Sequence, residues 1–247
     1  MKELPIRAFP RPCTPAPNAS PWRSTTGPGA RRCPGGRGSM RARCATSSRG
    51  SAPSGATWYA SSFFWEDFQP DPESVDGTAL AHLEVVADAA RDAGTGLDVT
   101  FFTGHMSGPN WVPTWLLGGD TFPAPGIRQV VSGGAKVVPG HYRTLFTDPV
   151  AITASRLLLT AVVTTWRRHP AIRCWNLGNE PDLFSWPPDH LTGGAWVRQM
   201  ADTIKSVDDV QPVTCGLHVY SLQWTNGLRV PDVIGETDFA VMHTYQI

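Results

Sequence analysis

Apolar and polar positions follow two different periods along residues 77–247, and the changes of period predict helices and strands in turn. Three segments place apolar residues at helical spacing on one face: 77–93, 148–168 and 194–207. Short apolar runs bounded by turn residues predict strands at 97–102, 172–177, 213–217 and 239–242. Helix and strand in repeated alternation predict an α/β fold built on a parallel sheet.

The predicted strand at 172–177 leads directly into a carboxylate. Its apolar run is followed by Asn179-Glu180-Pro181. Parallel sheets place their chemistry at the C-terminal ends of the strands, and Pro181 biases the preceding Glu180 away from helical geometry. We therefore expect Asn179 and Glu180 to project together into a cleft at this end of the sheet.

Asn179-Glu180-Pro181 after a hydrophobic strand resembles the acid/base motif at the end of the fourth barrel strand in a large clan of retaining β-glycosidases. That clan includes glycoside hydrolase family 5, with its cellulases and endo-β-mannanases. The resemblance implies a (β/α)8 TIM barrel and hydrolysis of β-glycosidic bonds in a gluco- or manno-configured glycan. It also implies that Glu180 is the catalytic acid/base and that Asn179 hydrogen-bonds the sugar 2-hydroxyl.

A second stretch, Thr103–Trp115, is similar to the mannanase-like members of the family in particular, because many unusual residues agree there in order. The resemblance implies that His105, at a strand end, forms a hydrogen-bonding wall of the sugar site. A surface loop histidine is the plain alternative. Trp111 and Trp115 would be stacking platforms for sugar rings or, equally, would pack the loop against the barrel.

Histidines also follow the next two predicted strands. His218 comes directly after the strand at 213–217, and the strand at 239–242 is followed by His243-Thr244-Tyr245. The His-x-Tyr pattern resembles the site residues of the family's sixth strand, which contact the nucleophile or the sugar. The expected substrate contacts are therefore Asn179, His105, Trp111, His218, His243 and Tyr245.

The resemblance covers about residues 63–247, since Phe63–Pro70 is similar to the end of the family's second strand and its following loop. The arginine that the family carries a few positions earlier is replaced by Ala60-Ser61-Ser62. We expect an incomplete (β/α)8 barrel that contains strands two to six. Residues 56–247 would then form a partial TIM-barrel glycoside hydrolase domain, truncated at both ends.

A retaining glycosidase needs two carboxyl groups about 5–5.5 Å apart, one as acid/base and one as nucleophile. Glu180 fits the first role, and the second belongs at the end of a seventh strand that we expect to be absent from this chain. Glu66, Asp182 and Glu236 are poor substitutes by position. The chain is therefore expected to be inactive as it stands, and a catalytically dead fragment that only binds carbohydrate is the alternative.

A metal hydrolase is a further alternative. It would use His105, His218 and His243 with Glu180, which converge at one face if the barrel interpretation holds. No His-Glu-x-x-His or comparable spacing supports it. We expect no metal and no cofactor.

Residues 1–55 have a different character from the rest of the chain. They hold ten Lys and Arg but one acid, Glu3, and are rich in Pro, Gly and Ser without an apolar period, which predicts disorder. This basic arm could be a nucleic-acid tether or have no function. We favour a third interpretation, translation out of frame, because a permitted shifted reading of Cys44–Ser62 gives a helix followed by a buried strand similar to that of the mannanase-like enzymes.

Composition narrows the partners and the compartment. The sequence has no continuous run of about 18 apolar residues and no apolar core of a signal peptide at its start, so we expect no membrane partner and a cytoplasmic chain as written. An oligo- or polysaccharide is the expected substrate, and no specific nucleic acid is expected. Cys13, Cys33 and Cys44 match no zinc spacing, whereas Cys174 and Cys215 lie inside predicted strands and are expected to be buried, inert thiols.

Overall fold

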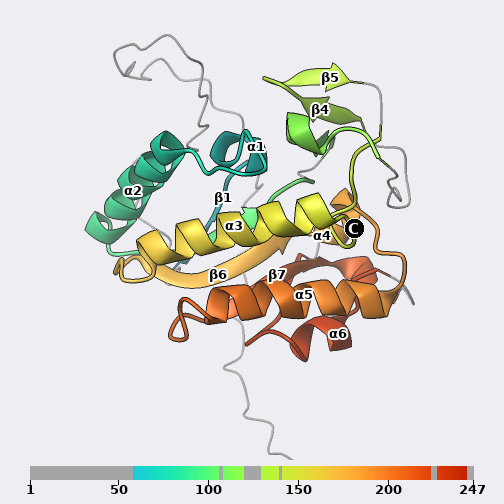
Figure 1. The fold of residues 1–247 in the computed structure, drawn as a ribbon. Helices are drawn as coiled ribbons and strands as arrows, with labels where there is room; N and C mark the ends of the chain where they lie inside the picture. Colours follow the sequence, from blue (N-terminus) through green and yellow to red (C-terminus); the bar gives the residue numbers. More distant parts are fainter. Residues whose placement is uncertain (1–57, 106–107, 120–128, 139–140, 224–226, 244–247) are drawn as a thin grey trace, which may run out of the picture. The chain divides into compact units, whose positions relative to one another are not determined.

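The computed structural model describes residues 58–105, 108–119, 129–138, 141–223 and 227–243, all of which belong to one compact unit. The basic arm predicted at 1–55 lies outside the described residues. A five-stranded parallel sheet with the order β1-β2-β6-β7-β8 forms the centre of this unit (Figure 1). Its strands are β1 (Trp58–Ser62), β2 (Gly96–Phe102), β6 (Ile172–Asn179), β7 (Val213–His218) and β8 (Val241–His243).

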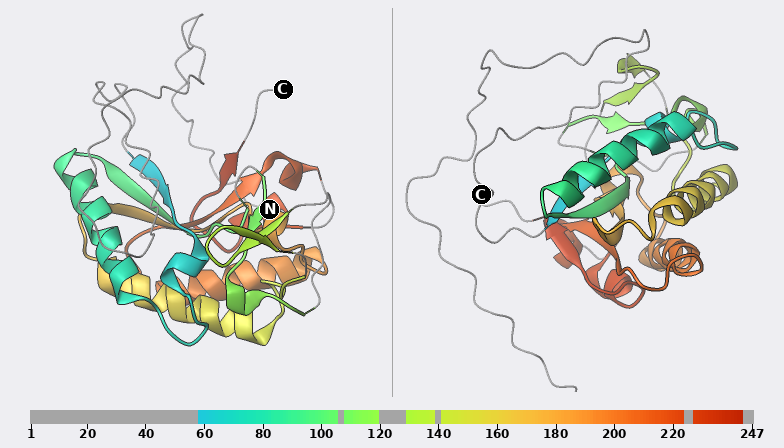
Figure 2. Two further views of the ribbon diagram at one scale, coloured as in Figure 1. Left: turned by 90° about the horizontal axis from the view of Figure 1, so that it is seen from above. Right: turned by 90° about the vertical axis from the view of Figure 1, so that its left-hand side faces the viewer.

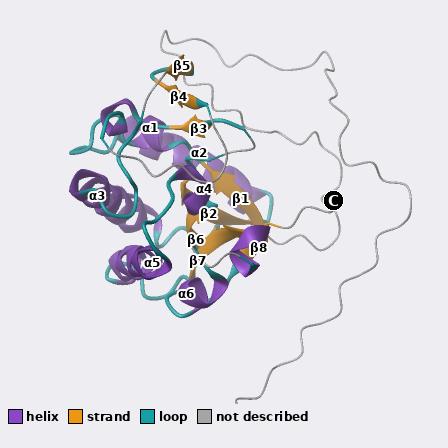
Figure 3. Cartoon of the chain, turned by 90° about the vertical axis from the view of Figure 1, so that its right-hand side faces the viewer, coloured by secondary structure: helices purple, strands orange, loops and turns teal. Residues whose placement is uncertain are grey.

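Helices connect each strand to the next. The three long ones are α2 (Gly77–Asp92), α3 (Pro149–Trp166) and α5 (His190–Lys205), and short α1 (Trp65–Phe68), α4 (Pro181–Phe184) and α6 (Val230–Ile234) supplement them. The helices α3 and α5 lie side by side along one face of the sheet (Figures 2 and 3). This alternation confirms the expected fold, a partial (β/α)8 barrel with strands two to six in order.

Each long helix begins at an aspartate. Asp76, Asp148 and Asp189 accept backbone N–H groups of the first turn of α2, α3 and α5, which satisfies donors that have no partner inside the helix. Pro149 occupies the first turn of α3, where its missing N–H costs nothing. The sequence therefore determines the starts of these helices locally.

The core lies between the helices and the sheet. Val99 and Phe101 of β2 and Trp175 and Leu177 of β6 are fully buried there, together with Leu158 of α3. By length and composition alone α3 could cross a membrane, a test that a core helix also passes. Its buried positions run along the whole helix, so α3 serves as a core helix of this unit.

The connection between β2 and α3 forms a small sheet where the sequence showed no periodicity. It contains β3 (Asn110–Trp111), β4 (Val130–Ser132) and β5 (Lys136–Val138), in that order, with a 3-10 turn η1 (Thr114–Leu116). Strands of two or three residues are too short to show a period, so the pattern could not reveal them.

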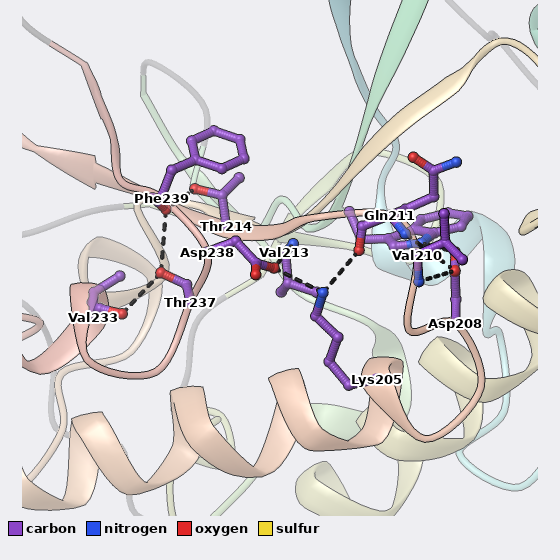
Figure 4. A network of polar contacts seen from close by, with 11 residues as sticks. Lys205, Asp208, Val210, Gln211, Val213, Thr214, Val233, Thr237, Asp238 and Phe239 are labelled. Carbon is purple, nitrogen blue, oxygen red and sulfur yellow. Dashed lines mark hydrogen bonds and ion pairs between the residues drawn. The ribbon is translucent and has the colours of Figure 1, made fainter. Parts of the chain in front are cut away.

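The entry into β8 differs slightly from its prediction at 239–242, because β8 begins at Val241. Asp238 and Phe239, which precede β8, instead form hydrogen bonds with the first two residues of β7. Asp238 accepts the Val213 N–H at 2.7 Å, and the Phe239 carbonyl accepts from Thr214 (Figure 4). The Lys205 Nζ, in the last turn of α5, also lies 2.8 Å from Asp238 Oδ2. This polar network therefore joins α5, the start of β7 and the segment before β8 at the N-terminal end of the sheet.

Gly216 in β7 provides a test of strand packing. A Cβ at this position would lie 2.7 Å from the Gly178 carbonyl oxygen of β6, so Gly216→Ala should push backbone apart and lower the free energy of unfolding by about 1–3 kcal/mol. Gly77, at the start of α2, has no atom within 4 Å of its Cβ position. Gly77→Ala should be neutral or stabilising. Urea unfolding of both variants measures the difference, and equal midpoints would contradict this packing.

Candidate active site

Polar side chains gather where the parallel strands end. Asn179 ends β6 and Glu180 follows it, His218 ends β7 and His243 ends β8. His105 lies three residues beyond β2. Because these strands are parallel neighbours, their C-terminal ends meet at one edge of the sheet.

Glu180 has an unusual backbone conformation. Its φ of 54° and ψ of 56° lie in the left-handed region, which non-glycine residues seldom adopt. The Glu180 N–H donates to the Gly216 carbonyl of β7 at 3.0 Å, and the Glu180 carbonyl accepts from Leu183 in α4. The turn therefore directs the chain sharply away from β6, and the Glu180 side chain is buried to 5% exposure.

His243 is the side-chain partner of Glu180. The ring Nδ1 of His243 and Oε1 of Glu180 form a hydrogen bond of 3.0 Å. The ring packs on Gly216, where a Cβ would lie 3.0 Å from His243 Cε1. The structure thus brings together the predicted acid/base and the predicted histidine of the last strand, across 63 residues of chain.

Asn179 and His105 are joined through the backbone. The Asn179 amide nitrogen donates to the His105 carbonyl oxygen at 2.8 Å. Beyond it, His105 Nδ1 donates to Asn110 Oδ1 at 3.0 Å, and the Asn110 amide donates to the hydroxyl of Tyr142 at 2.7 Å. Tyr142 in turn donates to the Phe184 carbonyl of α4. This chain of hydrogen bonds fixes the loop after β2 against the turn that follows Glu180.

The two tryptophans of the same loop have different environments. Trp115 donates its indole N–H to the Gln69 carbonyl at 2.8 Å and packs edge-on against buried Trp65. Trp111 is half-buried and packs against Phe64, with ring centroids 4.6 Å apart. Trp115 is therefore a packing residue, and Trp111 stays the candidate for a sugar platform.

His218 is held by the protein at both ring nitrogens. Its Nε2 lies 3.1 Å from Asp182 Oδ2, and its Nδ1 accepts the Tyr220 N–H at 3.1 Å. The side chain is 4% exposed. This geometry places His218 inside the protein beside the site, and its predicted substrate contact stays a prediction. Tyr245 lies outside the described residues.

The three histidines of the metal alternative have separate partners. His105 bonds Asn110, His218 bonds Asp182 and His243 bonds Glu180. Within the described ranges, no group of three or more His, Cys, Asp and Glu side chains is arranged to hold a metal ion.

A second polar cluster forms around Asn176 of β6, which precedes Glu180 in the chain. The Asn176 amide donates to Asp98 Oδ2 at 3.2 Å, and Asn176 Oδ1 accepts the N–H of Gly216 at 3.1 Å, so one side chain joins β2, β6 and β7. Burial raises the pKa of Asp98, and hydrogen bonds from Asn176 and its neighbours oppose that rise. Burial also raises the pKa of the Cys174 thiol beside Asp98.

Sequence reasoning missed most of the residues that support the site. Tyr142 and Asn176 carry no motif, Asn110 was not singled out within the Thr103–Trp115 stretch, and the roles of all three depend on contacts between distant segments. Asp98 had one available signal. It alternates with apolar Leu97 and Val99 in a predicted strand, which places it on the opposite face of the sheet.

Comparisons with known proteins agree with the fold. Residues 128–243 match the family "Glycosyl hydrolases family 2, TIM barrel domain". Mannan endo-1,4-beta-mannosidase A from Hypocrea jecorina is 33% identical over 102 residues, which cover 41% of this chain and 23% of that enzyme. Mannan endo-1,4-beta-mannosidase 8 from Oryza sativa subsp. japonica is 31% identical over 97 residues, 36% of this chain and 24% of that enzyme. The chain thus matches about a quarter of the length of these curated relatives.

Solved structures give the same fold. A GH5_18 protein from Streptomyces cattleya, in complex with Manb1-4GlcNAc, superposes with a TM-score of 0.64 at 18% identity and covers 77% of this chain and 43% of its own. The exo-beta-1,4-mannosidase Op5Man5 from Opitutaceae bacterium strain TAV5 has a TM-score of 0.62 at 24% identity, covering 77% and 32%.

The solved structures show the fold of a partial TIM barrel, and the family model that matches residues 128–243 describes a TIM-barrel domain of glycosyl hydrolases. The family match and the two mannosidase relatives support a likeness to β-glycosidases of the glycoside hydrolase family 5 type, as the motifs predicted.

The two cysteines of the sheet should be chemically inert. Cys174 and Cys215 are fully buried, and burial raises the pKa of each thiol, so little of the reactive thiolate forms. We expect iodoacetamide at pH 8 to modify neither residue in the folded chain and both in urea, as located by peptide mass spectrometry. Modification of Cys215 at the unfolded rate would show that β7 is not packed as described.

Proposed function

We propose that this site belongs to a retaining β-glycosidase that acts on a manno- or gluco-configured β-linked glycan, with Glu180 as its acid/base. The observation that carries the proposal is the pairing of Glu180 with His243 at 3.0 Å, at the C-terminal ends of two parallel strands. Glu180 of the Asn179-Glu180-Pro181 motif, after β6, thus contacts His243 at the end of β8, as the family resemblance implies.

The family resemblance assigns Glu180 its chemistry. As the acid it protonates the leaving glycosidic oxygen, and as the base it later activates the water that releases the sugar. Asn179 is held by its amide nitrogen on the His105 carbonyl. In this proposal its side-chain oxygen accepts a hydrogen bond from the sugar 2-hydroxyl, a contact that strengthens in the transition state.

The nucleophile of this reaction is proposed to lie on a further strand, outside these 247 residues. Three candidate carboxylates of the chain are engaged elsewhere. Glu66 accepts hydrogen bonds from Thr114, Glu236 pairs with Arg198, and Asp182 bonds His218. The chain also matches only 23% and 24% of the length of its mannosidase relatives.

The polypeptide as given would then bind a saccharide without turning it over, and carbohydrate binding alone is the second candidate function. The substrate class is taken from the relatives. Both curated relatives are mannan endo-1,4-beta-mannosidases, and one structural neighbour holds Manb1-4GlcNAc. A β-1,4-linked mannoside is therefore the ligand to test first.

We expect β-1,4-mannobiose to shift the NMR signals of the His105 and His243 side chains in the 247-residue chain, whereas α-linked maltose should not. No aryl β-mannoside hydrolysis is expected from this chain. In a protein that also carries the nucleophile strand, Glu180→Gln should lower turnover by about 10²–10⁴-fold, because proton transfer is lost.

Glu84→Gln is the matched control, since Glu84 is exposed on α2, away from the site. This variant should bind mannobiose as the wild type does. Robust hydrolysis by the 247-residue chain that Glu180→Gln leaves unchanged would overturn the mechanism. Equal shifts with maltose and mannobiose would overturn the substrate class.

A further inference from the structure

Asp182 is a buried carboxylate for which the proposed reaction has no use. It lies in α4, two residues after Glu180, and is 1% exposed. Its Oδ2 accepts hydrogen bonds from His218 Nε2 at 3.1 Å and from the Leu228 N–H at 3.0 Å. Among the described residues, its buried Oδ1 has no hydrogen-bond partner. Burying a carboxylate is costly unless donors stabilise it, so Asp182 depends on the two donors at Oδ2.

The tautomer of His218 follows from its partners. Because Nδ1 accepts the Tyr220 N–H, the ring proton is on Nε2, which donates to Asp182. His218 therefore links two elements. It caps the 3-10 turn η2 (Val219–Leu222) at the end of β7, and it bonds the short helix that follows Glu180.

The backbone at Gly227 packs against Asp182. Gly227 has φ of +85°, and a Cβ there would lie 2.9 Å from Asp182 Oδ2 and 3.0 Å from the Trp186 ring. The backbone therefore lies directly against the carboxylate, and Leu228 donates to it from the same loop. The Oδ2 atom of Asp182 thus connects three segments: α4, the end of β7 and the loop that contains Leu228.

Glu180 needs such support, because its left-handed backbone is disfavoured for a residue with a side chain. β7 holds the turn at two points. The Gly216 carbonyl accepts the Glu180 N–H, and His218 binds Asp182. The first contact fixes the residue itself, and the second fixes the helix that begins directly after it.

We propose that Asp182 and His218 are positioning residues that hold the Glu180 turn in its left-handed conformation and so place the acid/base carboxyl beside His243. This inference rests on the proposed function for its consequence, the binding of a β-linked mannoside. The hydrogen-bonded geometry can be tested without it.

Two substitutions at His218 separate the two ring contacts. In His218→Gln the side-chain amide nitrogen takes the place of Nε2 and can still donate to Asp182. In His218→Asn the side-chain oxygen takes the place of Nδ1 and can still accept from Tyr220, but the bond to Asp182 is lost. Asp182→Ala removes the acceptor of both bonds.

We expect long-range proton–nitrogen NMR of the wild-type chain to show His218 protonated at Nε2. His218→Asn and Asp182→Ala should move the Glu180 and Leu228 amide signals and weaken β-1,4-mannobiose binding by about tenfold or more, the scale for losing one partner of a buried hydrogen bond. His218→Gln should leave these signals near their wild-type positions and keep binding within about twofold. Circular dichroism confirms that each variant folds.

The outcomes distinguish the two proposals. If wild type binds no mannobiose while the Glu180 amide responds to His218→Asn and not to His218→Gln, the positioning role stands and the substrate class fails. If His218→Asn and His218→Gln have equal effects on Glu180, or if His218 carries its proton on Nδ1, the positioning role is overturned. If His218→Asn unfolds, Asp182→Ala and the tautomer of His218 in the wild-type chain decide between these outcomes.

Discussion

The hydrogen bond from the Glu180 N–H to the Gly216 carbonyl is the contact on which the site depends. It holds a glutamate in a left-handed conformation at the end of β6, so the chain turns away and the side chain lies at the edge of the sheet. The bond requires β6 and β7 to lie close together. They do so because Gly216 has no Cβ, which would lie 2.7 Å from the Gly178 carbonyl oxygen of β6.

The rest of the fold supplies this edge with partners. Because the sheet is parallel, β8 places His243 at the same end of the sheet as Glu180. The loop after β2 places the His105 carbonyl within hydrogen-bonding distance of Asn179. The polar network at the other end, around Lys205 and Asp238, fixes how β8 enters the sheet. The position of His243 thus depends on contacts far from it.

The sequence predicted what is local and periodic. The aspartates before α2, α3 and α5 mark the helix starts, and the apolar runs mark β2, β6 and β7. The Asn179-Glu180-Pro181 motif predicted the acid/base position by resemblance. Contacts between distant segments could not be predicted. The bond between His218 and Asp182 of α4 is such a contact, because no spacing in the sequence links the two residues. The short strands β3, β4 and β5 carried no period to detect.

The central claim is that a β-linked glycan binds at the C-terminal ends of these strands with its glycosidic oxygen beside Glu180. The most direct measurement is a crystal structure of the chain with β-1,4-mannobiose. The account predicts that the glycosidic oxygen lies within hydrogen-bonding distance of the Glu180 carboxyl. A disaccharide bound at the N-terminal ends of the strands, or one that leaves Glu180 untouched, would contradict it.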